Sequence, residues 1–200
     1  MLGLDFDNTL VRYDTLFHQL ALEKNLIDSS VAPDKITIRD YLRAKGQEED
    51  FTLLQGEVYG RRILEASPAE GMLEALIKIK ELNIPIVIVS HKTRYPYKGE
   101  RYDLHLSALK WLREYSFFEL NGIGMQEDQV YFETTKEKKA TRVRSLGCNY
   151  FLDDLPEILA LLHHEITSIL YDPGLNHPAS SIEKRISHWS QLPKIIKYFT

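Results

Sequence analysis

The stretch "LDFDNTL", residues 4–10, places two carboxylates two residues apart at the end of the first apolar segment of the chain. Side chains two positions apart share one face of a strand, so Asp5 and Asp7 point the same way before Asn8 and Thr9 turn the chain. Two carboxylates this close repel each other, and one stays protonated unless a metal ion neutralises them. Taken alone, the stretch is explained equally well by surface acids at a turn, with Asp7 as a helix cap.

Apolar segments alternate with helix-like segments along much of the chain. The apolar runs at residues 2–6, 84–89, 130–132, 150–152 and 166–171 are typical of buried parallel strands. Segments 72–82, 104–115, 136–146 and 156–164 have the apolar period of a helix. This alternation predicts the α/β class, with a doubly wound, Rossmann-like parallel sheet and right-handed crossovers. Ligands of such sheets bind at the carboxyl ends of the strands.

One interval lacks this alternation. Residues 12–69 contain no convincing buried strand, and segments 14–25, 38–45 and 49–66 are typical of helices. The proline-containing stretch "EASPAEG", residues 65–71, marks the end of the interval. We therefore expect a core domain made of residues 1–11 and 70–200 and an all-helical insertion at 12–69. The chain ends with a short strand-like "RIS" at 185–187 and a helix at 190–199.

Composition limits the possible partners and location. Hydrophobic residues make up 44% and charged residues 27%, as in an ordinary globular protein with a packed core. The net charge of −4 gives no global reason to expect nucleic acid or an anionic membrane, so we expect neither as a partner, and a local basic patch stays open. No apolar run approaches the ~18 residues of a membrane span. A signal-peptide pattern is absent, and Cys148 has no disulfide partner, so we expect a cytoplasmic protein.

Further polar side chains follow the later predicted strands. Ser90 ends the strand "IPIVIVS", and the pair at residues 153–154 ends "NYFLDD". Thr134, with Glu137 three residues later, has the pattern of a capping box, so the run of residues 136–139 opens a helix at the same edge of the sheet. Any of the three lysines in that run could reach the edge. The sequence thus gathers hydroxyl, carboxylate and ammonium groups around one crevice.

These residues resemble the haloacid dehalogenase (HAD) superfamily, most of whose members are magnesium-dependent phosphatases. The first motif of that family, D-x-D-x-[TV], is similar to residues 5–9, and the second, a Ser or Thr ending an apolar strand, is similar to Ser90 in "VIVSHKT". The lysine motif is similar to the "KKA" run, in which Lys139 has the family's phase, and the acidic motif to "FLDDLPE". Order, spacing and strand context agree over nearly the whole chain.

The resemblance implies a catalytic role for both residues of the first acidic pair. Asp5 would be the nucleophile that forms an aspartyl-phosphate, and Asp7 would protonate the leaving oxygen and later deprotonate water. Mg²⁺ would be held by Asp5, the backbone carbonyl of Asp7 and Asp154, with Asp153 as a ligand or as a residue that orients one. The fourth motif lacks a Gly-Asp pair, which leaves the division between Asp153 and Asp154 open.

The resemblance also implies a phosphate-binding set. Ser90 and Lys139 would hold the phosphoryl oxygens and spread the developing charge. Thr9, the last residue of the first motif, and His91, which follows Ser90, belong to the same expected set. Lys138 is the alternative to Lys139.

The second aspartate separates two reaction classes within the resemblance. Cleavage of a carbon–halogen bond releases halide and needs no acid, so dehalogenases of this group lack Asp at that place. Asp7 therefore favours phosphoryl transfer, and the insertion at 12–69 resembles a helical cap of the first type, which implies a small phosphorylated metabolite as substrate. A phosphomutase or other phosphoryl transferase would use the same residues. A protein that binds a phosphorylated ligand without turnover is a further alternative, and the oligomeric state stays open.

The segment "SHKTRYPYKGERYD", residues 90–103, interleaves cations with tyrosines directly after the second motif. Arg94, Tyr95 and Lys98 are candidates for contact with a second anionic group, a sugar or a base of the substrate. The same pattern fits a solvated loop whose tyrosines pack on the cap. It also fits single-stranded nucleic acid, although the segment is short and the protein is acidic.

Overall fold

A computed structural model describes residues 1–162, 164–178 and 184–197. The chain divides into two compact units. The first contains Met1–Val11, Pro68–Lys92 and Ser116–Thr200, and the second contains Arg12–Ser67 and Thr93–Tyr115. These boundaries differ from the expected domains, because residues 93–115 group with the helical insertion and not with the sheet.

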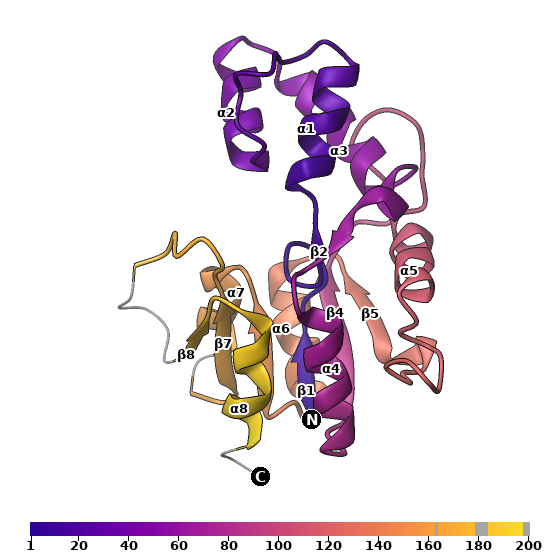
Figure 1. Cartoon of the computed structure of the whole chain (residues 1–200), viewed down its shortest axis with the longest axis vertical. Helices are drawn as coiled ribbons and strands as arrows, with labels where there is room; N and C mark the ends of the chain where they lie inside the picture. The colour runs from indigo at the N-terminus through magenta and orange to yellow at the C-terminus, as the bar shows by residue number, and fades with distance from the viewer. Residues whose placement is uncertain (163, 179–183, 198–200) are drawn as a thin grey trace. The chain divides into compact units, whose positions relative to one another are not determined.

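The first unit is built on a parallel sheet, shown in Figure 1. Among the described residues the sheet has the strand order β5-β4-β1-β6-β7-β8, and every neighbouring pair whose register is known is parallel. The strands are β1 (Leu2–Leu4), β4 (Ile86–His91), β5 (Val130–Glu133), β6 (Tyr150–Asp153), β7 (Thr167–Tyr171) and β8 (Lys184–Ile186). The prediction of a doubly wound α/β sheet is confirmed. β1 lies in the interior of the sheet, so the residues after Leu4 emerge between the ends of β4 and β6.

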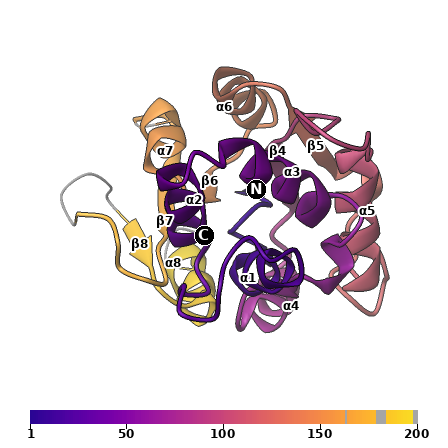
Figure 2. The same ribbon diagram turned by 90° about the horizontal axis from the view of Figure 1, so that it is seen from above.

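Helices cover both faces of this sheet. Figure 2 shows α6 (Lys136–Ser145) and α7 (Pro156–Leu162) on one side, and α4 (Met72–Glu81) and α8 (Leu192–Lys197) on the other. The expected C-terminal helix is therefore present up to Lys197, and its predicted last two residues, 198 and 199, lie outside the described residues. No helix in the described ranges is long and apolar enough to cross a membrane.

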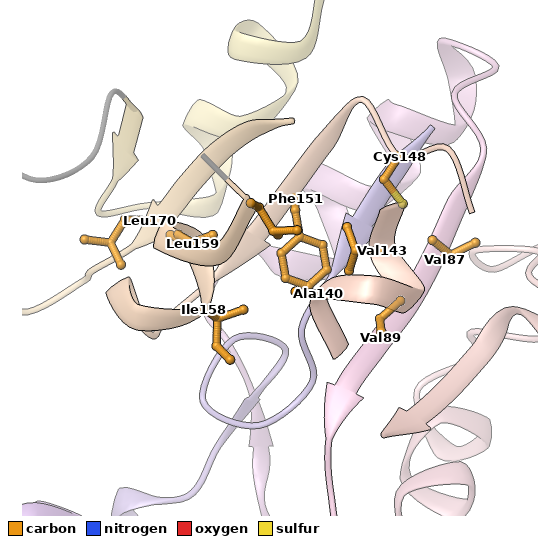
Figure 3. Close-up of a cluster of buried hydrophobic side chains, with 10 residues drawn as sticks. Val87, Val89, Ala140, Val143, Cys148, Phe151, Ile158, Leu159 and Leu170 are labelled. Carbon is orange, nitrogen blue, oxygen red and sulfur yellow. The ribbon is translucent and has the colours of Figure 1, made fainter. Parts of the chain in front are cut away.

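The core on the α6 and α7 side is closely packed, as Figure 3 shows. It joins strand residues to helix residues, namely Val87, Val89, Phe151, Leu170, Ala140, Val143, Ile158, Leu159 and Leu162, together with Cys148. Gly3 allows the Phe151 ring to pack directly against the backbone of β1, because a Cβ at this position would lie 2.6 Å from the ring. Cys148 is buried in this core, and burial raises the pKa of its thiol to about 11.

The N-cap of helix α6 lies one residue after the threonine that the sequence pattern predicts. The N-cap is Thr135, whose side chain accepts a hydrogen bond of 3.2 Å from the backbone N–H of Lys138. The prediction of Thr134 as the cap is wrong, because Thr134 and Thr135 have the same capping chemistry and sequence alone does not separate neighbours. Lys139 still falls in the first turns of the helix, and its side chain is buried.

The second unit is helical. It contains α1 (Asp14–Glu23), α2 (Lys35–Ala44), α3 (Glu48–Tyr59), the 3₁₀ helix η1 (Ile63–Glu65) and α5 (Leu104–Glu114). The helix expected at 49–66 is interrupted at Gly60, where a Cβ would lie 2.6 Å from Tyr102. Trp111 of α5 donates a hydrogen bond of 2.8 Å to the carbonyl of Ala66, which explains why residues 93–115 belong to this unit.

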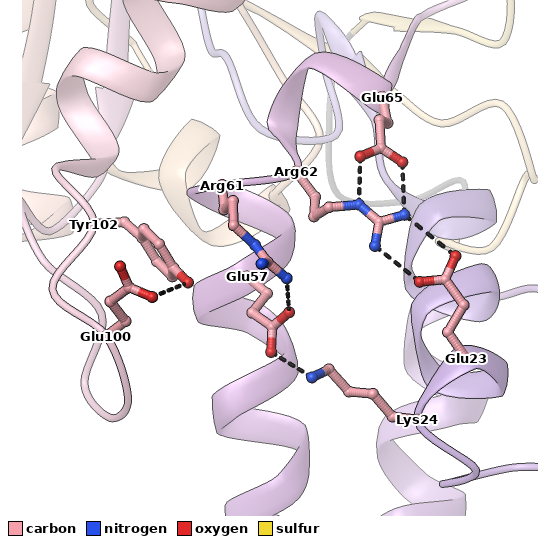
Figure 4. A network of polar contacts seen from close by, with 8 residues as sticks. All are labelled: Glu23, Lys24, Glu57, Arg61, Arg62, Glu65, Glu100 and Tyr102. Carbon is pink, nitrogen blue, oxygen red and sulfur yellow. Dashed lines mark hydrogen bonds and ion pairs between the residues drawn. The ribbon is translucent and has the colours of Figure 1, made fainter.

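Ion pairs join α1, α3 and η1 within this unit, as Figure 4 shows. Arg62 contacts Glu23 and Glu65, and Glu57 contacts Lys24 and Arg61. The Arg62 guanidinium holds the pKa of Glu23 at about 2. Two-residue strands, β2 (Val11–Arg12) and β3 (Ser67–Pro68), pair with each other at the ends of the insertion.

Candidate active site

Asp5 lies at the carboxyl end of β1 and is held from both its backbone and its side chain. Its N–H donates to the carbonyl of Leu152 at 2.9 Å, which continues the pairing with β6. The side chain is buried, and its Oδ1 lies 2.5 Å from Nζ of Lys139. Lys139 Nζ also lies 2.6 Å from Oδ2 of Asp153, which ends β6. One ammonium group from α6 therefore bridges carboxylates that follow two neighbouring strands.

The charges in this bridge are strongly coupled. Burial alone would lower the pKa of Lys139, but the carboxylates of Asp153 and Asp5 outweigh it and raise this pKa above its ordinary value. Burial raises the pKa of Asp153, and the Asp5 charge acts in the same direction, while the Lys139 ammonium opposes both. Lys139 is thus a permanent cation, and Asp153 is a carboxyl whose ionised form needs positive charge beside it.

The turn after β1 adds a hydroxyl to Asp5. Asn8 has a φ of 59°, and the N–H groups of Leu10 and Val11 both donate to the carbonyl of Phe6. This tight turn buries Thr9, whose Oγ1 donates a hydrogen bond of 3.2 Å to Oδ2 of Asp5. In the structure Thr9 therefore contacts the carboxylate that the sequence identifies as the nucleophile.

Three carboxylates gather at this edge of the sheet. Asp5, Asp153 and Asp154 each offer an oxygen, and these oxygens lie within 4.8 Å of one another. Lys139 supplies a single positive charge to this cluster. All the donors are hard oxygens, which suit Mg²⁺, so the residues present fit the metal that the sequence predicts. The Asp7 carboxylate is not part of this group, and a contribution from its backbone carbonyl stays a prediction.

Ser90 places a buried hydroxyl on the strand next to Asp5. It lies in β4, the neighbour of β1, and its side chain is 1% exposed. Its Oγ makes no hydrogen bond within the described residues. A buried hydroxyl without a partner is costly, which favours a role in binding a ligand that supplies the missing partner.

Lys92 is a site residue that the sequence analysis counts among the cations of segment 90–103 but does not single out. Its Nζ lies 2.7 Å and 2.8 Å from the two carboxylate oxygens of Asp7, and its side chain is 3% exposed. A signal was present, because Lys92 lies two residues after Ser90 and the strand period places both side chains on one face. Because Lys92 is followed by several further charged residues, it is not distinguished in the sequence from the cations of the loop.

The other predicted site residues are placed less centrally. His91 lies at the end of β4, and its Nε2 is 3.2 Å from the carbonyl oxygen of Thr134. Arg94, Tyr95 and Lys98 lie in the second unit. Arg94 pairs with Asp103 at 2.9 Å and Lys98 pairs with Glu49 at 2.7 Å. Their assignment as substrate contacts stays a prediction.

Comparisons with known proteins agree with this architecture. No protein-family model matches the chain. A hydrolase of the HAD superfamily from Entamoeba histolytica is 15% identical and superimposes with a TM-score of 0.58 over 98% of each chain. A hydrolase from Pseudomonas syringae is 12% identical, with a TM-score of 0.58 over 100% of this chain and 98% of the other. The chain has the HAD fold. The predicted resemblance is confirmed at the level of the fold.

Other proteins similar to this chain differ in the reaction that they are named for. An L-2-haloacid dehalogenase is 12% identical, with a TM-score of 0.57 over 98% of this chain and 97% of the other. A Bacillus cereus protein described as "Putative nucleotidase" is 24% identical in an alignment that covers 98% of this chain and 97% of the relative. The HAD fold thus leaves the reaction to be argued from the residues of the site.

Proposed function

We propose that the protein is a Mg²⁺-dependent phosphatase that hydrolyses a small phosphorylated metabolite through an aspartyl-phosphate. The observation that carries this proposal is the set of groups at the end of β1. A buried carboxylate, Asp5, is held against the Lys139 ammonium. Beside it on the next strand lies a buried hydroxyl, Ser90, that makes no hydrogen bond with any residue that the structure describes. A phosphoryl group would supply the acceptor that this hydroxyl lacks, and its negative charge would be attracted to the Lys139 ammonium.

The first half of the reaction follows from these positions. An oxygen of Asp5 attacks the phosphorus, and the bond between phosphorus and the leaving oxygen breaks. The leaving oxygen keeps the electron pair and takes a proton from Asp7. Lys139 and Ser90 hold the phosphoryl oxygens and spread the charge that develops on them.

The second half returns the enzyme to its initial state. Water attacks the phosphorus, Asp5 leaves as a carboxylate, and Asp7 accepts the proton of the water. Asp5, Asp153, Asp154 and the backbone carbonyl of Asp7 would hold Mg²⁺, which would reduce the repulsion between carboxylate and phosphate. Thr9 fixes the orientation of the nucleophile through its bond to Oδ2.

Asp7 favours phosphoryl transfer over dehalogenation. Halide is a stable leaving group and needs no proton, whereas an alkoxide leaving from phosphate does. An acid two residues after the nucleophile is useful only to the second reaction. The alternatives that share the site are a phosphomutase, which transfers the phosphoryl group to a hydroxyl, and a protein that binds a phosphorylated ligand without turnover.

The substrate class rests on the insertion and on the relative. A helical cap at 12–69 would exclude water and select small substrates, and Arg94, Tyr95 and Lys98 are the proposed contacts with the remainder of the substrate. The name of the Bacillus cereus relative places nucleoside monophosphates first in a panel of candidates. We expect this activity in the cytoplasm.

The test is hydrolysis of p-nitrophenyl phosphate by the purified protein in Mg²⁺, followed by a panel of nucleotides, sugar phosphates and phosphorylated organic acids. Asp5→Asn, which preserves shape and removes the nucleophile, should abolish turnover. Activity unchanged by Asp5→Asn would contradict the aspartyl mechanism. Bound Mg²⁺ without turnover on the whole panel would favour the binding protein, and transfer to an acceptor hydroxyl would favour the mutase.

A further inference from the structure

Lys92 is held in a fixed place beside Asp7. Its backbone N–H donates to the carbonyl of Glu133 at 3.0 Å, which continues the pairing of β4 with β5 past the end of the strand. Its Nζ lies 5.5 Å from the centre of the Phe6 ring. Lys92 is therefore held at its backbone by β5 and at its ammonium group by the Phe6 ring, and it is not a mobile surface residue.

Lys92 contacts both oxygens of the Asp7 carboxylate, and the two side chains differ in exposure. Lys92 Nζ reaches both oxygens of Asp7, at 2.7 Å and 2.8 Å, and so fixes the plane of that carboxylate. The Lys92 side chain is 3% exposed, whereas the Asp7 side chain is 22% exposed. Burying an ammonium group is costly unless it is paired. The buried member of the pair thus supports a partner that stays accessible to water.

We propose that Lys92 is a positioning residue that holds the Asp7 carboxylate as the proton acceptor in the hydrolysis of the aspartyl-phosphate. This inference rests on the proposed phosphatase function. In that step the water oxygen bonds to phosphorus, and the bond from phosphorus to Asp5 breaks with its electron pair remaining on Asp5. The proton of the water passes to Asp7, whose two carboxylate oxygens Lys92 contacts in the structure.

A direct contact with the phosphoryl group is the competing role for Lys92. The contacts favour Asp7, because the ammonium is engaged with both oxygens of that carboxylate. Lys139, by comparison, bridges Asp5 and Asp153 at the nucleophile itself. The two lysines are therefore associated with different aspartates of the first motif, and we assign them to different tasks.

The experiment separates the two halves of the reaction with 2,4-dinitrophenyl phosphate, whose leaving group needs little protonation. Lys92→Met keeps the length of the side chain and removes the charge. We expect its steady-state turnover to fall about 10- to 100-fold, the range for a misplaced base. We also expect the fraction of chains carrying phosphate on Asp5, measured by mass spectrometry after acid quench, to rise. Lys24→Ala, which removes another paired lysine, is the control.

The outcomes distinguish the inference from the function on which it rests. An active Lys92→Met enzyme whose phosphorylated fraction is unchanged or lower contradicts the role of Lys92 alone. An inactive, never phosphorylated wild type contradicts both, since no base then needs positioning. In the Asp7→Asn background, Lys92→Met should change turnover less than about 2-fold, because interacting residues are not additive. Losses that multiply would identify Lys92 as a direct phosphate ligand and overturn the inference.

Discussion

Lys139 Nζ lies 2.5 Å from Oδ1 of Asp5, although 134 positions separate the two residues in the sequence. Both side chains are buried, and the same ammonium also contacts Asp153. A buried ion pair stabilises a fold little by itself, but removing one partner leaves an uncompensated charge. The bridge therefore links folding of the first unit to the chemistry of its site.

Lys139→Met should weaken both folding and activity. Loss of the ammonium leaves Asp5 and Asp153 buried without their cation, so we expect the free energy of unfolding to fall by about 3–5 kcal/mol. Urea denaturation measures this change. Lys138→Met removes an exposed neighbour and should change stability by less than about 1 kcal/mol while retaining turnover. If Lys138→Met instead abolished turnover, the phosphate contact would belong to Lys138.

Stabilisation by Mg²⁺ should depend on pH through Asp153. Burial raises the pKa of this carboxyl, so its contribution to stability is fully present below the ordinary pKa of Asp and is lost as the pH rises through the higher folded value. A divalent cation removes that penalty by neutralising the ionised form. The increase in Tm on adding Mg²⁺ should therefore be larger at pH 8 than at pH 5. An increase that does not vary with pH would show that Asp153 does not take part in metal binding.

Ser90→Ala should separate stability from function. The Ser90 hydroxyl is buried and has no hydrogen-bond partner in the described part of the chain, so removing it eliminates an unsatisfied group. We expect the free energy of unfolding to stay the same or to rise by up to about 1 kcal/mol. Turnover of p-nitrophenyl phosphate should fall about 10- to 100-fold, since one charge-stabilising donor is lost. A large loss of stability would show that the hydroxyl has a structural partner instead.

The sheet could be predicted from the sequence because its signals are local. Each strand is a short apolar run, and the acids of the first and fourth motifs directly follow those runs in the sequence. Lys92 and Asp7 are 85 positions apart, and no local pattern indicates that pair. Residues 93–115 were assigned to the core by their position after β4. Their place in the second unit depends on contacts such as that of Trp111 with Ala66, which only the folded chain reveals.

Gly3→Ala should destabilise the first unit by overpacking. The added Cβ would lie 2.6 Å from the Phe151 ring and 3.1 Å from Sγ of Cys148, within a core that has little room to adjust. We expect a loss of about 1–3 kcal/mol in the free energy of unfolding. Native Cys148 should resist alkylation, because its pKa is raised to about 11, and in Gly3→Ala the alkylation rate should increase. If Gly3→Ala and the wild type had equal free energies of unfolding and equal rates of Cys148 alkylation, this packing argument would be contradicted.

Arg94→Ala tests whether the segment after β4 contacts the substrate. Its guanidinium is largely exposed and pairs with Asp103, which caps α5 through the N–H groups of His105 and Leu106. The cap does not need Arg94, so stability should change by less than about 1 kcal/mol. If Arg94 binds the substrate outside its phosphate, KM for the physiological substrate should rise, while KM for p-nitrophenyl phosphate should not.

Arg39→Ala is the matched control for this prediction, because Arg39 forms a comparable ion pair with Asp40 in the same unit. It should leave both KM values unchanged. An equal rise for both substrates in Arg94→Ala would indicate a contact with the phosphate itself. Unchanged values for both would limit Arg94 to its ion pair with Asp103, and the search for specificity residues would then move to the insertion at 12–67. A rise in KM for the physiological substrate alone would identify the segment after β4 as part of the substrate-binding surface.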